Sequence, residues 1–147
     1  MATKQEMEML IKDLKEKLKA AQELIKRKVE DIPLEMFTSL KENDILFIDS
    51  SHVVKIDNDV CFLYLEVMPR LLEGVIIHVH DIILPSIYNK GWYNAKYFWN
   101  EQFLLQAFLM FNNSFEIIWA ANYMHVKHPN KLIDAFKSYS WFKDSDN

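Results

Sequence analysis

The chain of 147 residues is long enough for a single domain with a substantial core, and its 50% hydrophobic content excludes an intrinsically disordered protein. Its net charge of −4 gives no reason to expect a nucleic-acid ligand, and its one cysteine, Cys61, excludes a disulfide framework and a cysteine-based metal site. Because no apolar run approaches the roughly 18 residues of a membrane span, and the charged N-terminus lacks an apolar signal core, we expect a cytoplasmic protein.

Residues 3 to 24 are expected to form an amphipathic helix, which would make 1–24 an N-terminal helical segment of the single domain 1–147. Thr3 followed by Glu6 fits a capping box at its start. Apolar side chains then recur at helical spacing: Met7, Leu10, Ile11, Leu14, Leu18, Ala21 and Ile25. Such a stripe is typical of a helix that covers a sheet, and the alternative is a short coiled coil between two chains.

The next segment leads into the first core strand. Residues 24–29 alternate weakly in hydrophobicity and could form a short strand. A short helix is expected to follow through Leu40, because Pro33 suits the first turn of a helix.

Two apolar strands end in polar residues that can carry chemistry. The four apolar residues at 45–48 are typical of a strand buried on both faces of a parallel sheet, and D-S-S-H follows at 49–52. Residues 74–82 repeat this pattern. Polar side chains at the carboxyl ends of parallel strands lie where open α/β sheets bind ligands. We expect four such side chains to meet at one edge of the sheet: Asp49, His52, His80 and Asp81.

A helix is expected between these two strands. Asp57 or Asn58 would cap its start, and the helix would run to about Leu72 with a mostly apolar body. Gly74 lies just past its end, as a helix-terminating glycine does. Strand, helix and strand between residues 44 and 82 therefore form a βαβ unit, whose crossover is expected to be right-handed.

The rest of the chain is expected to add an aromatic connection, two helices and two strands. The connection, residues 83–98, could fold over the site as a lid, and the alternative is that its aromatic side chains pack the loop onto the core. Helices are expected at 99–112 and 129–137, a third apolar strand at 115–121, and a last short strand at 138–143.

Three stretches, taken together, resemble one enzyme family. They are F-I-D-S-S-H at 47–52, I-H-V-H-D-I at 77–82 and W-N-E-Q-F-L-L-Q-A-F-L at 99–109. They resemble the class I S-adenosylmethionine-dependent methyltransferases, and most closely the small-molecule O-methyltransferase-like group. The resemblance extends from residue 24 to residue 143, so that 25–143 would be a partial methyltransferase-like α/β domain.

The resemblance implies an α/β fold in three layers, with a Rossmann-like, mostly parallel sheet of four or five strands. Strands 44–49, 74–80 and 115–121 would be the fourth, fifth and sixth of the family's seven strands. Residues 138–142 would form the antiparallel seventh strand, between the fifth and the sixth.

The family's glycine-rich turn is missing from this chain. In the family, that turn follows the first strand and lets the backbone approach S-adenosylmethionine, and an acidic residue after the second strand binds the ribose. This chain has two glycines, Gly74 and Gly91, and no Gly-x-Gly, so it offers no obvious nucleotide cradle. The resemblance therefore implies the C-terminal half of a methyltransferase, which we do not expect to be active alone.

Loss of the family's first strand would leave an apolar sheet edge beside residues 44–49, and such an edge invites pairing. We expect this edge to be covered either by residues 24–29 or by a second copy of the chain in a homodimer. A separately supplied N-terminal half is the other partner that the resemblance implies.

Two kinds of chemistry are expected at the strand ends. Asp49, His80 and Asp81 could bind Mg²⁺, because carboxylate oxygens suit this ion and related methyltransferases place carboxylates at such positions. The alternative is that these residues are solvated and form only local hydrogen bonds. His52, with Asp49, is the candidate catalytic residue, since histidine can act as a general base near neutral pH; it could equally cap the following loop.

The remaining aromatic and histidine side chains have more general expected roles. Five could line a pocket for the methyl acceptor: Tyr88, Trp92, Trp99, Asn100 and Glu101. His78 shares a strand face with His80 and is expected to be buried and hydrogen-bonded, and Trp119 is expected in the core. His125 and His128 are expected at the surface.

The leading hypothesis for function is a truncated methyltransferase-like domain, whose parent activity is methyl transfer from S-adenosylmethionine to a small-molecule acceptor. The alternative is a non-enzymatic oligomerisation or partner-binding module that uses the N-terminal helix and the open sheet edge. Neither nucleic acid nor a membrane is expected as a partner.

Overall fold

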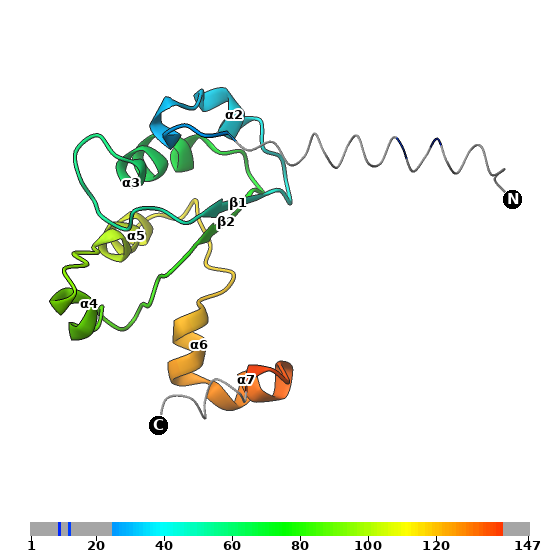
Figure 1. The fold of residues 1–147 in the computed structure, drawn as a ribbon. Helices are drawn as coiled ribbons and strands as arrows, with labels where there is room; N and C mark the ends of the chain where they lie inside the picture. Colours follow the sequence, from blue (N-terminus) through cyan, green and yellow to red (C-terminus); the bar gives the residue numbers. More distant parts are fainter. Residues whose placement is uncertain (1–8, 10–11, 13–24, 140–147) are drawn as a thin grey trace, which may run out of the picture.

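The fold is organised around a pair of parallel strands. The computed structural model describes residues 9, 12 and 25–139. Within them, β1 (Ile45–Ile48) pairs with β2 (Ile76–Val79), with Ile45 opposite Ile76 (Figure 1). Both strands consist mainly of β-branched and large apolar residues, which suit a pleated and buried surface. The two expected core strands are therefore confirmed, with shorter bounds than predicted.

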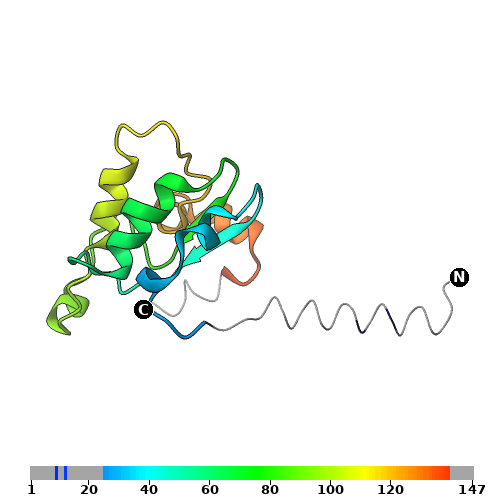
Figure 2. The same cartoon turned by 90° about the horizontal axis from the view of Figure 1, so that it is seen from above.

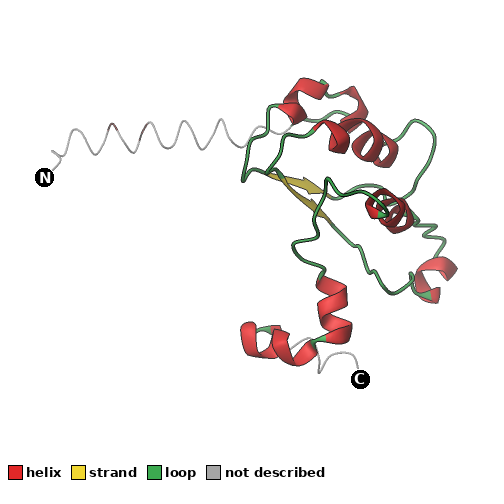
Figure 3. Cartoon of the chain, turned by 180° about the vertical axis from the view of Figure 1, so that it is seen from behind, coloured by secondary structure: helices red, strands yellow, loops and turns green. Residues whose placement is uncertain are grey.

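Helical segments precede, connect and follow the strands. Before β1 lie η1 (Val29–Asp31) and α2 (Leu34–Thr38), and between the strands lie α3 (Asp59–Phe62), η2 (Leu63–Val67) and η3 (Met68–Arg70). After β2 come α4 (Lys90–Asn94), α5 (Glu101–Leu109), α6 (Ala121–Lys127) and α7 (Pro129–Ala135). Figures 1 and 3 show α2 and α3 on one side of the strand pair, and α6 and α7 on the other.

The helix expected between the strands is present but irregular. The Asn58 side chain caps its start by accepting a hydrogen bond from the Cys61 N–H. The backbone then changes from α-helix in α3 to π-helix in η2 and to 3₁₀-helix in η3. Pro69 in η3 has no N–H to donate to the Leu65 carbonyl, which is approached instead by the Arg70 guanidinium at 3.5 Å. This proline is a physical reason for the change of helix type near the end of the segment.

The hydrophobic core lies between one face of the strand pair and this helical segment. Among the described residues, six side chains form its buried centre: Ile48, Val60, Leu63, Tyr64, Val67 and Met68. Alternate residues of β1 point to opposite faces, so Leu46 packs against the core while Ile45 and Phe47 are 62% and 58% exposed. In Figure 2 the helical segment 59–70 lies beside α5, whose Leu104 and Phe108 also pack against the core.

The sheet is smaller than the sequence predicted. In the part of the chain that the structure describes it has two strands, not four or five. Residues 115–120 form no strand, and α6 begins at Ala121. Trp119 is 56% exposed, so its expected place in the core was wrong. An apolar stretch becomes a strand only where a neighbour supplies backbone hydrogen bonds, and no described segment does so for these residues.

Other expectations concern the ends of the chain. Residues 25–28 form no strand, and neither do residues 138 and 139. Most of the helix expected at 3–24, and the remainder of the last expected strand, lie outside the described residues. A search of the described residues finds no helix with the length and hydropathy needed to cross a membrane.

Candidate functional site

The loops that leave the two strands both contain a residue with left-handed backbone geometry. His52, after β1, has a φ of 58°, and Asp81, after β2, has a φ of 54°. This geometry costs a residue other than glycine about 1–2 kcal/mol and persists where surrounding contacts impose it. The N–H groups of Asn100 and Glu101 donate to the His52 carbonyl at 2.9 and 3.1 Å. The start of α5 therefore holds the His52 backbone in place.

His52 forms a buried pair with Glu101. The Nδ1 atom of His52 lies 2.8 Å from Oε2 of Glu101, and the two residues are 6% and 0% exposed. The Ser50 hydroxyl donates to the same carboxylate oxygen at 2.7 Å. Because a carboxylate only accepts hydrogen bonds, Nδ1 carries the proton of the neutral imidazole and Nε2 carries its lone pair. Glu101 is also the first residue of α5, where the helix dipole stabilises a negative charge.

Two further carboxylates flank the Nε2 atom of His52. Asp49 Oδ1 lies 3.6 Å away and Asp81 Oδ2 lies 3.9 Å away. Both distances exceed that of a hydrogen bond, so neither carboxylate engages Nε2 directly. The structure thus brings together three of the four strand-end residues that the sequence singled out.

The fourth strand-end residue, His80, lies to one side of this cluster. Its Nε2 is 3.4 Å from Asp81 Oδ1, and its ring packs near Phe47, with ring centroids 5.7 Å apart. His78 is exposed and stacks on Phe47 at a centroid distance of 4.6 Å, so the prediction of a buried His78 was wrong. That prediction required a sheet covered on both faces, and this face of the strand pair is open among the described residues.

No metal site is evident in the described part of the chain. No group of three or more His, Cys, Asp or Glu side chains there is arranged to hold a metal ion. The expected Mg²⁺ site at Asp49, His80 and Asp81 therefore has no support from the structure.

The residues expected to line an acceptor pocket have different surroundings. Trp99 packs its ring against His52, with centroids 4.2 Å apart. The Asn100 side chain accepts a hydrogen bond from the Val54 N–H and so holds the loop after His52. Glu101 is the partner of His52, a role that the sequence analysis missed. The sequence marked Glu101 through the stretch 99–109 and as an acidic residue near the start of a helix, but no spacing links it to His52.

The aromatic connection after β2 forms a cavity of about 370 Å³ beside Trp99. Among the described residues, its walls are Ile87, Tyr88, Tyr93, Tyr97, Phe98, Trp99 and Phe103. Trp92 packs against Trp99, with centroids 4.7 Å apart. The connection also contains α4, where the sequence predicted no regular structure.

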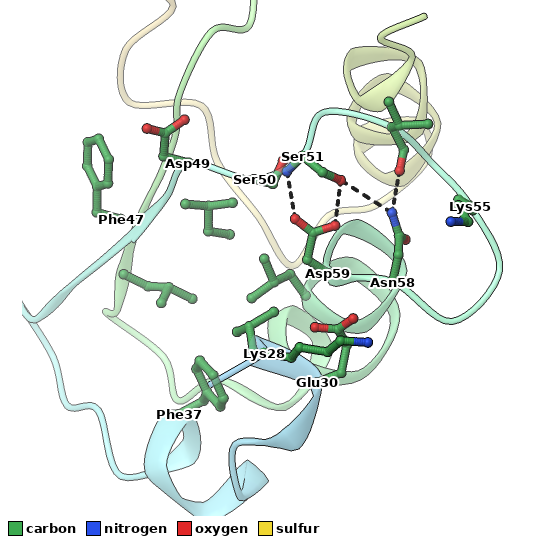
Figure 4. A pocket seen from close by; sticks show the side chains of 15 residues that line it. Lys28, Glu30, Phe37, Phe47, Asp49, Ser50, Ser51, Lys55, Asn58 and Asp59 are labelled. Carbon is green, nitrogen blue, oxygen red and sulfur yellow. Dashed lines mark hydrogen bonds between the residues drawn. The ribbon is translucent and has the colours of Figure 1, made fainter. Parts of the chain in front are cut away.

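A larger cavity, of about 700 Å³, runs along the unpaired side of β1 (Figure 4). Phe37 and Phe47 contribute apolar side chains, and the strand-end loop contributes polar ones. Ser51 donates from its N–H and its hydroxyl to the two carboxylate oxygens of Asp59, each at 2.6 Å. These bonds tie the loop to the start of α3 and leave the edge of β1 open.

Tyr64 lies in the core next to the Glu101 carboxylate. The Tyr64 hydroxyl and Oε1 of Glu101 are both buried, and neither has a hydrogen-bond partner among the described residues. Burial is the main cause that raises the pKa of the Tyr64 hydroxyl, and the negative charge of Glu101 raises this pKa further. The folded protein therefore keeps the phenolic proton at a pH where an exposed tyrosine loses it.

This raised pKa predicts a loss of stability in alkali. In the unfolded chain Tyr64 ionises near pH 10, whereas the folded chain retains the proton, so the stabilising contribution is complete below about pH 10 and decreases above it. Each pH unit above that point should lower the free energy of unfolding by about 1.4 kcal/mol for this one group. Urea titrations at several pH values from about 8 to 11 would measure this slope, because this range includes the usual tyrosine pKa of about 10.

In the Tyr64→Phe variant, the decrease in the free energy of unfolding per pH unit above about pH 10 should be smaller by about 1.4 kcal/mol. Its stability at neutral pH should be unchanged or slightly higher, because the removed hydroxyl has no hydrogen-bond partner among the described residues. Tyr97→Phe, at a 54% exposed position, is the matched control and should keep the original slope. Equal slopes for Tyr64→Phe and the unmodified protein would contradict the prediction.

A protein-family model matches the part of the chain that contains β1 and β2. Residues 2–82 match a family model described as a methyltransferase domain. The chain belongs to this family. The matched residues include β1, β2, the loop after β1 and the first residues of the loop after β2, and they begin closer to the N-terminus than the resemblance noted in the sequence. Searches of curated proteins and of solved structures found no match.

Methyltransferases of this kind use S-adenosylmethionine as methyl donor, but the described residues of this methyltransferase domain do not fit that cofactor. The loops at the carboxyl ends of β1 and β2 contain carboxylates and histidines and no glycine. Gly74 has a φ of 85° and precedes β2, at the opposite end of the strand, where a Cβ atom would lie 2.6 Å from Glu42 Cγ. Gly91 lies within α4. The described residues therefore provide no backbone cradle for the donor at the strand ends.

Proposed function

We propose that this methyltransferase domain carries the acceptor side of an S-adenosylmethionine-dependent methyl transfer to a small molecule, with His52 as the general base. The observation that supports this proposal is the buried pair formed by His52, in the loop after β1, and Glu101, the first residue of α5. A carboxylate that orients one nitrogen of a histidine leaves the other nitrogen available for proton transfer.

Each residue of the pair has a distinct role in this proposal. Glu101 accepts the Nδ1–H of His52 and thereby sets the tautomer and the direction of the ring. The Nε2 atom then takes a proton from the hydroxyl or amine of the acceptor. Asp49 and Asp81, at 3.6 and 3.9 Å from Nε2, stabilise the imidazolium that forms.

We also propose that the chain by itself does not complete the transfer, because its described residues offer no cradle for the donor. Calorimetric titration of the purified chain with S-adenosylmethionine, with and without Mg²⁺, tests this part of the proposal. We expect no binding in the micromolar range and no effect of the metal. Micromolar binding would overturn this part and would leave the role of His52 to be tested separately.

The role of His52 is tested without any cofactor. Nitrogen-15 NMR of the histidine side chains reports which ring nitrogen carries the proton. We expect the Nδ1–H tautomer for His52, with its signal assigned by the His52→Gln variant. Ser50→Ala removes the hydroxyl that donates to Glu101 and accepts from the His52 backbone N–H, but it keeps the side-chain bond between His52 and Glu101, so it should leave the tautomer unchanged. A proton on Nε2 in the neutral imidazole would overturn the role of general base.

One observation favours a second candidate function, a non-enzymatic module that binds a partner or a second copy of the chain. In the described residues β1 pairs on one side only, and Ile45 and Phe47 on its outer face are exposed. Light scattering of the full chain would test it. We expect the mass of a dimer if the module binds a second copy of the chain, and a strict monomer would count against self-association.

A further inference from the structure

The cavity beside Trp99 is built almost entirely from aromatic rings. Among the described residues, six of its seven lining side chains are aromatic, and the seventh is Ile87. None of these lining side chains carries a charge. Its volume of about 370 Å³ falls in the range of about 300–1,000 Å³ that is usual for small-molecule sites.

The rings around this cavity face in several directions. Tyr88 meets Trp99 at an interplanar angle of 82°, with centroids 6.0 Å apart, whereas Tyr97 lies nearly parallel to Trp99 at 15°. Tyr93 and Phe98 meet at 84°. The face of an aromatic ring carries a negative potential, so a cation that lies over any of these rings is attracted to it.

Carboxylates add to this negative potential from the side of His52. Burial is the main cause that raises the pKa of the Tyr88 hydroxyl, and the charges of Glu101 and Asp81 raise it further, against a backbone interaction with Gln102 that lowers it. The field of both carboxylates therefore reaches the wall of the cavity. Lys90 and Lys96 belong to the same connection, but both are exposed and neither lines the cavity, so solvent screens their charge.

We propose that this aromatic cavity binds a small organic cation, such as an amine or a quaternary ammonium compound. Trp99 is a wall of the cavity and also packs against His52, which does not itself line the cavity, so one side chain separates the bound cation from the candidate base. The identification of such a cation as the methyl acceptor rests on the proposed function, whereas the binding of the cation to the cavity does not.

The test compares two ligands of the same shape. Choline and 3,3-dimethylbutan-1-ol differ in that a positively charged nitrogen replaces a neutral carbon. Titration of the full chain, followed by tryptophan fluorescence or calorimetry, gives both affinities. A cation between aromatic rings gains about 1–2 kcal/mol, so choline should bind roughly tenfold more tightly than its neutral analogue. Equal affinities, or no binding of choline at millimolar concentration, would overturn the proposal.

Two pairs of measurements connect the preference to named residues. Tyr97→Leu, at a 54% exposed position that should tolerate the change, is expected to reduce the preference for choline severalfold, and Tyr97→Phe should retain it. Asp81→Asn removes a negative charge, and asparagine tolerates the left-handed backbone geometry of this position. This variant should weaken the binding of choline without affecting the binding of the neutral analogue. If neither Tyr97→Leu nor Asp81→Asn changes the choline preference, the cation is not bound in this cavity.

These outcomes are separable from those of the proposed function. The choline titrations contain no S-adenosylmethionine and do not depend on the tautomer of His52. A negative result with choline together with the Nδ1–H tautomer would remove the inference and leave the proposed function in place. Choline binding together with an Nε2–H tautomer would support the cation site and overturn the role of His52 as general base.

Discussion

Replacing Glu101 by alanine should lower the free energy of unfolding by about 3–5 kcal/mol, because breaking a buried polar pair leaves its partner uncompensated. Glu101 is fully buried, and one of its carboxylate oxygens accepts hydrogen bonds from both His52 and Ser50. Truncation leaves both donors without this acceptor and also leaves a cavity. Urea denaturation at pH 7, followed by circular dichroism, would measure the change.

Two further variants separate this effect from a general sensitivity to the loss of glutamate. Glu101→Gln keeps the shape of the side chain and one acceptor oxygen, so its cost should be smaller than that of Glu101→Ala. Glu66→Ala removes an exposed carboxylate paired with Arg70 at 2.9 Å, and it should cost less than about 1 kcal/mol. A cost for Glu101→Ala as small as that of Glu66→Ala would show that the buried pair contributes little to stability.

Replacing Ile48 by alanine is the second substitution with a large expected effect. Ile48 is the last residue of β1, is 2% exposed, and belongs to the small buried cluster that holds the strand pair against the helical segment 59–70. Loss of a buried isoleucine side chain costs about 2–5 kcal/mol, because the transfer energy is lost and a cavity remains. The same urea titrations would measure this cost.

The matched control for Ile48→Ala lies in the same strand. Ile45 is also an isoleucine of β1 but is 62% exposed, so Ile45→Ala should lower the free energy of unfolding by less than about 1 kcal/mol. Comparable costs at the two positions would contradict the assignment of the core to one face of the strand pair. They would indicate that something covers Ile45 in solution.

Much of the βαβ unit could be predicted because its signals are local. A short apolar run between polar residues predicts a buried strand, and an asparagine before a helical pattern predicts a cap. The strand and the cap are confirmed, in β1 and at Asn58, but Ile45 and Phe47 are exposed, so the predicted burial of this strand on both faces was wrong. The family could be recognised for a similar reason, since the motifs at the ends of the strands are contiguous in sequence and the matched family model includes two of them.

The predictions that failed depended on neighbours that are not local. Residues 115–120 have the apolar composition of a strand, but no described strand lies alongside to pair with them. His78 has the position of a buried strand residue, but the face that it shares with Phe47 is open in the described residues. In both cases composition indicated a propensity, and the surroundings decided whether it was realised.

The sequence by itself determined which polar side chains follow the strands, where the helix between them begins, and that the chain is similar to methyltransferases. Only the tertiary structure decided that Glu101 pairs with His52, two residues 49 positions apart, and that Asp49 and Asp81 lie on either side of the free nitrogen. The physical reason is that backbone propensity and capping act between residues a few positions apart, whereas burial and the pairing of side chains depend on which distant segments fold against one another.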